Sequence, residues 1–358
     1  MLMFDEMVKK PASWLSGDGT NSGIVISSRI RQARNISNFP FPPAADEIQK
    51  EKVLSLFKTA LAKNPSLRKG NLLISAEVTD LDRTFLVERH LISPEFLQGK
   101  AYQGVFINKD ETLSIMINEE DHLRIQALQG GLKLQECYQL ASQTEEELGK
   151  ILKFDYDSEF GFLTSCPTNV GTGMRASILI HLPGLVLTRE IEGIINQMTK
   201  SSIAVRGFYG EGSDVLGNLF QISNQNTLGK SEIEILDTIS QVVEQVVVAE
   251  KKARETLYKD AKDQIEDKIW RAYGILKHAR MLSSNEVMNL LSALRLGIGC
   301  GTISQVSLNQ INEILVLSQP AHLQKYFNRQ MDANERDTTR AELVRLKLNG
   351  KGKSNTSH

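Results

Sequence analysis

Short apolar runs bounded by turn-forming residues recur through the first two thirds of the chain. They are rich in β-branched residues, which favours strands over helices. The predicted strands cover residues 104–108, 113–118, 176–182 and 218–224. Longer stretches with apolar residues at helical spacing cover residues 46–63, 81–90, 131–153 and 187–199. Because regular strand–helix alternation and a Gly-rich fingerprint are both absent from the sequence, we predict an α+β domain with a mainly antiparallel sheet flanked by helices.

The pattern changes near Ser231, beyond which the apolar stretches have helical spacing. The predicted helices cover residues 232–259, 263–280, 284–295, 308–317 and 334–348. Ser284 precedes one apolar run and Gly297 follows Leu296, and we take these as the start and stop signals of that helix. We therefore predict a first domain over residues 1–256, an all-helical domain over 257–349 and a disordered tail over 350–358.

Composition narrows the classes of protein and of site. The chain has 42 basic and 43 acidic residues, so no overall field would draw it to nucleic acid or to an anionic membrane. Its sequence has no apolar leader and no run of membrane-spanning length, which predicts a cytoplasmic protein. The three cysteines, Cys137, Cys166 and Cys300, are an odd number at wide spacing, and the six histidines show no ligand pattern. We therefore predict neither a disulfide framework nor a metal held by the protein.

Five arginines lie in short polar contexts rich in glycine or serine: Arg29, Arg31, Arg124, Arg175 and Arg206. In a strand, the two-residue spacing of Arg29 and Arg31 places both guanidinium groups on one face, where they repel unless an anion lies between them. A solvated surface position is the alternative for any single arginine. Five such contexts together favour a phosphate site, because planar guanidinium donors match phosphate oxygens.

Two acidic sites accompany the arginines. Residues 118–121 read Asn-Glu-Glu-Asp and follow a predicted strand, and alternating apolar residues come after them. We therefore predict that this cluster lies inside a sheet segment rather than at a loop tip, with a solvated turn as the alternative. Glu211 lies between two glycines, which would permit close approach of the backbone to a ligand, although a tight turn is the alternative.

The strings SSRIRQARN, NEEDHLRIQ, CPTNVGTGMRAS and RGFYGEG occur in this order. They resemble the signatures of the ATP:guanido phosphotransferase (phosphagen kinase) family, and NEEDH and CPTNVGTGMRAS are specific matches. RHLIS, RAYGILKHAR and RDTTRA extend the resemblance along the chain to the bacterial members that phosphorylate arginine in proteins. The resemblance implies a phosphagen-kinase-like catalytic domain over residues 1–256, with ATP as cofactor and Mg²⁺ bridging its phosphates.

The same resemblance assigns roles to individual positions. Those implied to bind the nucleotide are Ser27, Ser28, Arg29, Ile30, Arg31, His90, Arg124, Arg175, Ala176, Ser177, Ile178, Leu179, Arg206, Gly207, Phe208, Tyr209, Gly210 and Glu211. Glu120 and Glu211 are implied to hold and activate the acceptor guanidinium, and Cys166 to contact it. The alternatives are a helix-end role for His90 and a small buried filler role for Cys166.

RDTTRA places Arg336 and Arg340 on one helix face, with Asp337 beside them, a pattern that a solvated charged surface also explains. The resemblance implies that Arg336, Asp337, Arg340 and Ala341 form an allosteric phosphoarginine site. The arginines would take the phosphoryl group and the aspartate the guanidinium. Phosphoarginine would then be an activator that bridges a homodimer.

The SSRIR motif begins at Ser27, whereas small-molecule members of the family carry a long helical domain ahead of it. We therefore expect an acceptor site open enough for an arginine on a polypeptide. The predicted function is a protein-arginine kinase that marks proteins for a Clp-type unfoldase and protease during stress. Its predicted partners are arginine-bearing proteins, that protease and a zinc-binding activator protein. The alternatives are a kinase for free arginine or another small guanidine, and a catalytically silent phosphoarginine-binding adaptor.

Overall fold

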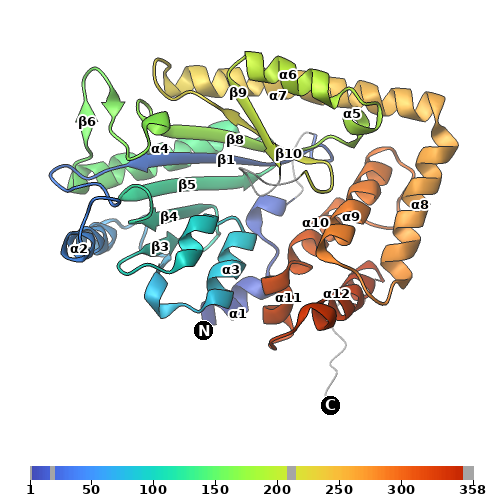
Figure 1. Cartoon of the computed structure of the whole chain (residues 1–358), viewed down its shortest axis with the longest axis horizontal. Helices are drawn as coiled ribbons and strands as arrows, with labels where there is room; N and C mark the ends of the chain where they lie inside the picture. The colour runs from blue at the N-terminus through green and yellow to red at the C-terminus, as the bar shows by residue number, and fades with distance from the viewer. Residues whose placement is uncertain (1, 17–20, 208–214, 350–358) are drawn as a thin grey trace.

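The structure, a computed structural model, describes residues 2–16, 21–207 and 215–349. Within these residues, eight strands form one antiparallel sheet (Figure 1). In spatial order they are β2 (Asn71–Ile74), β3 (Gly104–Ile107), β4 (Leu113–Ile117), β5 (Leu123–Gly130), β1 (Val25–Arg34), β8 (Met174–His181), β10 (Leu219–Asn224) and β9 (Ile203–Gly207). β6 (Tyr156–Asp157) and β7 (Gly161–Phe162) form a separate hairpin. The predicted α+β class and its antiparallel sheet are confirmed, and the four predicted strands all lie in this sheet.

Helices cover one face of the sheet over a large apolar core. They are α2 (Glu47–Lys63), α4 (Leu134–Leu152), α5 (Pro183–Leu187), α6 (Ile191–Lys200) and α7 (Glu232–Asp260). Ile30 of β1 and Ile178 of β8 pack in this core with Leu148 of α4 and Ile239 of α7. The prediction of a single helix over 187–199 is wrong at its start. α5 ends at Leu187 and α6 begins at Ile191, because the chain turns between them through Arg189 in the left-handed conformation, with φ of 63°.

A third group of elements lies between the sheet and the C-terminal helices. It comprises α1 (Leu2–Lys9), α3 (Asp80–Glu88) and the 3₁₀ turns η1 (Ser13–Leu15), η2 (Ser75–Glu77) and η3 (Pro94–Gln98). A further 3₁₀ turn, η4 (Pro167–Asn169), precedes β8. Thr79 caps the start of α3 through a reciprocal capping box with Asp82. Phe85 of α3 packs with Phe4 of α1 and Ala321 of the C-terminal helices.

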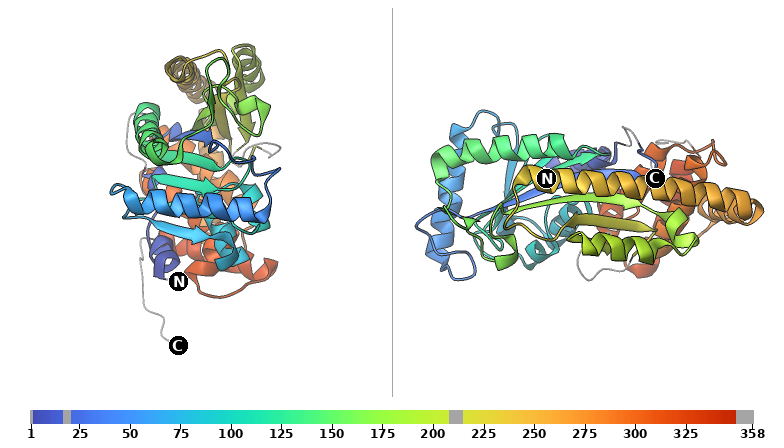
Figure 2. Two further views of the ribbon diagram at one scale, coloured as in Figure 1. Left: turned by 90° about the vertical axis from the view of Figure 1, so that its left-hand side faces the viewer. Right: turned by 90° about the horizontal axis from the view of Figure 1, so that it is seen from above.

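The C-terminal part is helical, as predicted. It comprises α8 (Lys262–His278), α9 (Ser284–Gly299), α10 (Leu308–Leu317), α11 (Pro320–Tyr326) and α12 (Ala333–Leu348), of which α11 was not predicted. α7 continues past the predicted domain boundary at residue 256 to Asp260 and leads from the sheet into these helices (Figure 2). A second apolar core joins the two parts, with Ile26, Leu128 and Leu179 of the sheet beside Leu291 and Ile314.

Gly297 does not end its helix, contrary to the prediction, because α9 runs on to Gly299. A Cβ atom at Gly297 would lie 2.6 Å from Cγ2 of Ile269 on α8. This glycine therefore allows α8 and α9 to approach closely, a requirement that a single helix does not reveal.

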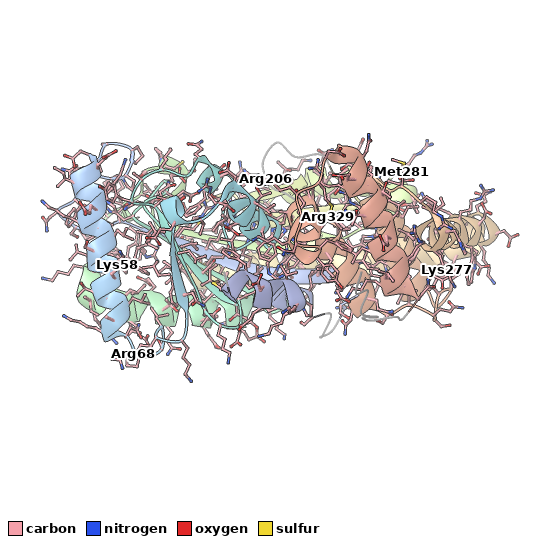
Figure 3. All side chains as sticks on the ribbon, turned by 90° about the horizontal axis from the view of Figure 1, so that it is seen from below. Lys58, Arg68, Arg206, Lys277, Met281 and Arg329 are labelled. Atoms are coloured by element: carbon pink, nitrogen blue, oxygen red, sulfur yellow. The ribbon has the colours of Figure 1, made fainter. Side chains whose placement is uncertain are left out.

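The molecule is elongated, with Lys58 on α2 and Lys277 on α8 toward its opposite ends (Figure 3). Among the helices that the structure describes, none has the length and apolar character needed to span a bilayer. The predicted tail, residues 350–358, lies outside the described residues.

Candidate functional site

The strand register brings the arginines of β1, β5 and β8 to one face of the sheet. Directly opposed residues of an antiparallel pair project to the same face. Arg31 of β1 opposes Arg175 of β8, and Ala33, two residues beyond Arg31, opposes Arg124 of β5. Arg29 and Arg31 therefore share this face with Arg124 and Arg175, as predicted for the first two from their spacing.

Arg206 on the neighbouring strand β9 joins the same face. It opposes Gln221 of β10, and Gln221 opposes Leu179 of β8. The Arg29 side chain spans these strands, since its Nη2 donates to Oε1 of Gln221 at 2.9 Å and its Nε to Oγ of Ser177 at 3.4 Å. We call this surface, with Arg29, Arg31, Arg124, Arg175 and Arg206, the arginine face.

The arginine face concentrates positive charge on half-buried side chains. Burial, then the charges of Arg124 and Arg175, lower the pKa of Arg29 to about 10. Burial and the same neighbours, together with Arg29, hold the pKa of Arg31 well below its ordinary value. Nε of Arg31 is buried without a hydrogen-bond partner among the described residues. Like charges across neighbouring strands destabilise a sheet, so the arrangement favours an anion bound between them.

His90 lies at one end of this face. Its ring meets that of Trp14 edge-on, with 4.8 Å between centroids, and its backbone is left-handed, with φ of 59°. Burial, then Arg29 and Arg31, lower the pKa of His90 to about 3, so the imidazole is neutral at physiological pH. A small hollow opens here, lined by Trp14, Ser27, Arg29, His90, Leu128, Ser177, Leu179 and Gln221.

The remaining predicted nucleotide positions divide between the two faces. Ser27, Ser177 and Leu179 line the hollow on the arginine face. Ser28, Ile30, Ala176 and Ile178 alternate with them, so their side chains face the helices. Ile30, Ala176 and Ile178 belong to the apolar core, and the Ser28 hydroxyl bonds the backbone at Gly131 and Lys133. A direct role for these four is thus confined to the backbone. Gly207 ends β9, and Phe208, Tyr209, Gly210 and Glu211 lie outside the described residues.

The acidic cluster forms the connection between β4 and β5, and the prediction that it lies inside a sheet segment is wrong. The two strands are antiparallel neighbours, so the chain must reverse between Ile117 and Leu123. Asn118 makes that reversal in the left-handed conformation, with φ of 56°, and its amide donates to the carbonyls of Lys50 and Tyr102. Asparagine tolerates this conformation better than most residues do.

Glu119 joins this turn to the arginine face, a role that the sequence did not reveal. Its carboxylate accepts from Nη1 of Arg124 at 3.0 Å and from the Ser93 hydroxyl. Burial alone would lower the pKa of Arg124, but Glu119 and then Glu120 raise it above its ordinary value. Glu119 thus fixes the orientation of Arg124, and the signal for it lies in contacts made by residues distant in sequence.

Glu120 and Cys166, predicted to act together, are neighbours in the structure. The Cys166 thiol lies near enough to the Glu120 carboxylate to lower its pKa, and is 3.0 Å from the Thr168 hydroxyl. Partial burial, then the charge of Asp121, raise the pKa of Glu120, whereas Arg124 and the Cys166 thiol oppose the shift. Glu120 is otherwise exposed, so a cationic group arriving from solvent could reach it.

Asp121 joins the turn that carries Glu120 to the segment that carries Cys166. Its Oδ1 accepts from Nδ2 of Asn35 at 2.7 Å and from the backbone N–H of Ser165 at 2.7 Å. Ser165 directly precedes Cys166, and Asp121 directly follows Glu120. The carboxylate of Asp121 therefore sets the distance between the acid and the thiol.

Two glycines shape the return from Cys166 to β8. Gly171 has φ of 110°, and a Cβ atom there would lie 2.4 Å from the carbonyl oxygen of Thr227. Gly173 has φ of 60°, and its Cβ would meet Nη1 of Arg34 and the carbonyl of Ala33. Only glycine fits both requirements, which explains the GTG within CPTNVGTGMRAS.

The RDTTRA motif lies on α12 and its two arginines differ in environment. Nε of Arg340 donates to the Ser318 carbonyl at 2.7 Å, and its Nη1 donates to the Leu282 carbonyl at 2.7 Å and to Asp337. Arg340 is only 2% exposed and Ala341 is fully buried. Arg336 is half-buried, with its Nη1 3.3 Å from the Met331 carbonyl. The arginine more accessible to a ligand is thus Arg336.

Comparison with known proteins identifies the family. The family model for the ATP:guanido phosphotransferase C-terminal catalytic domain matches residues 52–253. The chain belongs to the ATP:guanido phosphotransferase family. It is therefore a phosphotransferase that acts on a guanidino group and uses ATP, and the resemblance read from the motifs is confirmed. A second model, for the C-terminal domain of the protein-arginine kinase McsB, matches residues 262–358 of this phosphotransferase.

Individual relatives agree with these matches. A protein-arginine kinase from Desulforamulus reducens is 46% identical to this phosphotransferase, covering 96% of the chain and 98% of the relative. Another from a Geobacillus strain is 45% identical and covers 94% of each. Among solved structures, a duplicated taurocyamine kinase from Schistosoma mansoni, with bound transition-state analogue components, has a TM-score of 0.60 at 27% identity. The match covers 68% of this chain and 35% of that one.

Proposed function

We propose that this phosphotransferase is a protein-arginine kinase, which transfers the γ-phosphoryl group of ATP to an arginine side chain of a protein. The observation that carries the proposal is the placement of Glu120 and Cys166 beside Arg124, at the edge of the arginine face. One side of this site suits a polyphosphate and the other suits a cationic guanidinium. The protein-arginine kinases at 45–46% identity support a polypeptide as the acceptor.

In this proposal, ATP enters as its Mg²⁺ complex. Among the described residues, no group of three or more histidine, cysteine, aspartate or glutamate side chains could hold a metal ion. Glu119 is already engaged by Arg124 and Ser93, so the phosphates would supply most of the ligands to Mg²⁺. The arginine face would hold the phosphate oxygens, and His90 would lie near the nucleotide as a neutral side chain.

Glu120 would act on the acceptor. A guanidinium has a pKa far above neutrality, so freeing its nitrogen lone pair at pH 7 costs roughly 9 kcal/mol. The carboxylate would align the guanidinium and accept its proton while the N–P bond forms and the bond from the γ-phosphorus to ADP breaks. Glu211, outside the described residues, would be the second carboxylate, and Cys166 would orient the acceptor without forming a covalent bond.

One labelling experiment separates this function from a kinase for free arginine. The purified chain is incubated with γ-labelled ATP, Mg²⁺ and either casein or free arginine. We expect acid-labile label in casein and little in arginine. Label confined to free arginine would favour the small-guanidine kinase, and transfer to neither acceptor would contradict both assignments.

A pH profile tests the environment of Glu120. The raised pKa of Glu120 means that activity is lost as pH falls through that pKa, because only the ionised carboxylate can accept the proton. Asp121→Asn removes the neighbouring charge but keeps a carbonyl oxygen for the Ser165 N–H. The acid limb of kcat/KM for casein phosphorylation should therefore move to lower pH. The control is Asp110→Asn, which removes an exposed acid in the turn between β3 and β4. The acid limb of its kcat/KM profile should coincide with that of the unchanged protein. An unmoved limb in Asp121→Asn would remove Asp121 from this account.

The proposal extends to regulation and partners. Phosphoarginine in proteins would bind at RDTTRA, with Arg336 meeting the phosphoryl group, and would activate the enzyme as a homodimer. The marked proteins would pass to a Clp-type unfoldase and protease during stress, in the cytoplasm, and a zinc-binding activator protein would assist. These roles rest on the sequence resemblance, to which the match of the C-terminal family model over residues 262–358 adds support.

A further inference from the structure

Three consecutive residues at the end of α3 face three different parts of the molecule. Glu88 contacts α11 of the C-terminal helices, Arg89 contacts the turn before β4, and His90 contacts the arginine face. We call this segment the Glu88–His90 turn. Its three residues connect the C-terminal helices to the proposed nucleotide site through hydrogen bonds at one end and the His90 side chain at the other.

Glu88 caps α11 across the boundary between the two parts of the chain. Its Oε1 accepts from the N–H of Ala321 at 2.8 Å, and its Oε2 from the N–H of His322 at 2.9 Å. Nδ1 of His322 lies 2.7 Å from the same Oε2. The first N–H groups of a helix have no partner within it, so this carboxylate satisfies two of them. Glu88 is 7% exposed, which makes these bonds costly to lose.

Arg89 contacts His322 on the opposite edge of the imidazole from Glu88. Its Nε and Nη2 donate hydrogen bonds to the Glu111 carboxylate at 2.7 and 2.9 Å, and its Nη1 lies 3.5 Å from Nε2 of His322. A neutral imidazole with its proton on Nδ1 satisfies both contacts, donating to Glu88 and accepting from Arg89. Burial, then Arg89 and Lys325, lower the pKa of His322 well below its ordinary value, which agrees with that neutral form.

His90 follows the C-cap of α3 in the left-handed conformation, with local backbone bonds from its N–H to the Val87 carbonyl and from the Leu91 N–H to the Leu86 carbonyl. A left-handed backbone is uncommon for residues other than glycine, although histidine, like asparagine and aspartate, adopts it more often than most. The Arg89 carbonyl accepts from Nε1 of Trp14 at 3.0 Å, and the His90 carbonyl accepts from Nε2 of Gln126 at 2.7 Å. These bonds orient the imidazole toward Arg29 and Arg31.

We propose that Glu88 is a positioning residue, through which the C-terminal helices hold His90 in place on the nucleotide side of the arginine face. The proposal rests on the nucleotide-binding role given to that face above. It also reaches the RDTTRA motif, because Arg340 binds the Ser318 carbonyl two residues before α11 begins at Pro320. A change at α12 can therefore reach His90 through α11 and Glu88.

The test measures ATP binding rather than turnover. Without the Glu88 carboxylate, the N–H groups that start α11 and Nδ1 of His322 lose their acceptor, while the apolar contacts of α3 with α11 remain. Calorimetric titration of Glu88→Ala with Mg²⁺–ATP should give a Kd raised about tenfold over the unchanged chain. Glu88→Gln keeps an acceptor oxygen for the backbone N–H groups and should give an intermediate, two- to threefold rise, roughly what one weakened hydrogen bond allows.

The matched control removes a different contact between the same two helices. Lys325 of α11 pairs with Asp82 of α3, away from the Glu88–His90 turn. Asp82→Asn should leave the Kd for ATP unchanged, although it weakens the same interface. An equal rise in Asp82→Asn would show that general loosening, and not Glu88, sets the affinity, and would overturn the proposal.

A double variant tests whether Glu88 acts through His90. His90→Gly removes the imidazole and suits the left-handed backbone, so it should weaken ATP binding by itself. If Glu88 works only by placing that ring, Glu88→Ala/His90→Gly should bind ATP no more weakly than His90→Gly alone. Additive losses in the double variant would overturn the proposal.

Tryptophan emission supplies a readout of the turn in folded protein. Trp14 and Trp270 are the two tryptophans of the chain, and Trp270 is 43% exposed on α8. In a Trp270→Phe background, Glu88→Ala should shift the emission of Trp14 before ATP is added. If Glu88→Ala does not fold, an unchanged Kd in Glu88→Gln overturns the proposal. Failure of the unchanged chain to bind ATP would instead contradict the proposed function.

Discussion

Glu120→Gln should lower kcat for arginine phosphorylation about a thousandfold, while the KM for ATP stays within about twofold of the unchanged enzyme. Glutamine matches glutamate in shape but neither accepts the proton nor attracts a cation. Glu120 lies beside the Cys166 thiol, and the bond that fixes Arg124 comes from Glu119, so the arginine face should survive the change. Steady-state kinetics with casein and varied ATP would measure both constants.

The neighbouring carboxylate provides the control for that result. Glu119→Gln removes the charged partner of Arg124 and weakens the bond between residue 119 and the Ser93 hydroxyl. Arg124 then loses its fixed orientation on the arginine face, so the KM for ATP should rise more than kcat falls. The two adjacent glutamates would then show opposite kinetic signatures. Full activity in Glu120→Gln, or a purely kcat-directed loss in Glu119→Gln, would contradict the assignment of these roles.

Arg340→Met should lower the free energy of unfolding by about 3 kcal/mol, because it leaves hydrogen-bond acceptors in the interior without a donor. The Ser318 and Leu282 carbonyls and the Asp337 carboxylate all lose the same donor group. These contacts join α12 to the start of α9 and the end of α10, so the C-terminal helices should melt first. Thermal unfolding followed by circular dichroism would detect the loss.

Arg336→Met is the matched control within the same motif. Arg336 makes one long contact to the Met331 carbonyl and is half-buried, so the melting temperature should change little. In the proposed function, however, this variant should bind phosphoarginine weakly. Equal destabilisation by both changes would mean that Arg340 has no special structural role, and unchanged phosphoarginine binding in Arg336→Met would remove that residue from the site.

Local patterns predicted the elements that depend on local physics. The alternation in SSRIR placed Arg29 and Arg31 on one face of β1, and the structure agrees. The predicted helix over 46–63 appears as α2, with Asp46 as its cap. The motif resemblance also led to Glu120 and Cys166, which lie together in the structure.

The features that the sequence did not predict depend on distant partners. The bond from Asn35 to Asp121 spans 86 positions, and the contact of Arg89 with His322 spans 233. The pattern of residues along one segment predicts neither contact. The carbonyls that hold the buried Arg340 likewise come from two connecting segments, just before α9 and just after α10. Five arginines could be recognised from their contexts, but the pairing of Arg31 with Arg175 required the strand register.

β1 carries two sets of side chains on alternate positions, and this limits how its length can change. Ser27, Arg29 and Arg31 face one way, while Ser28, Ile30 and Gln32 face the helices. Inserting or deleting a single residue within this strand would send guanidinium groups into the apolar interior and isoleucine onto the charged side. Such a lesion would abolish folding and ligand binding together, so length variation among descendants of this chain should collect in its loops and spare this strand.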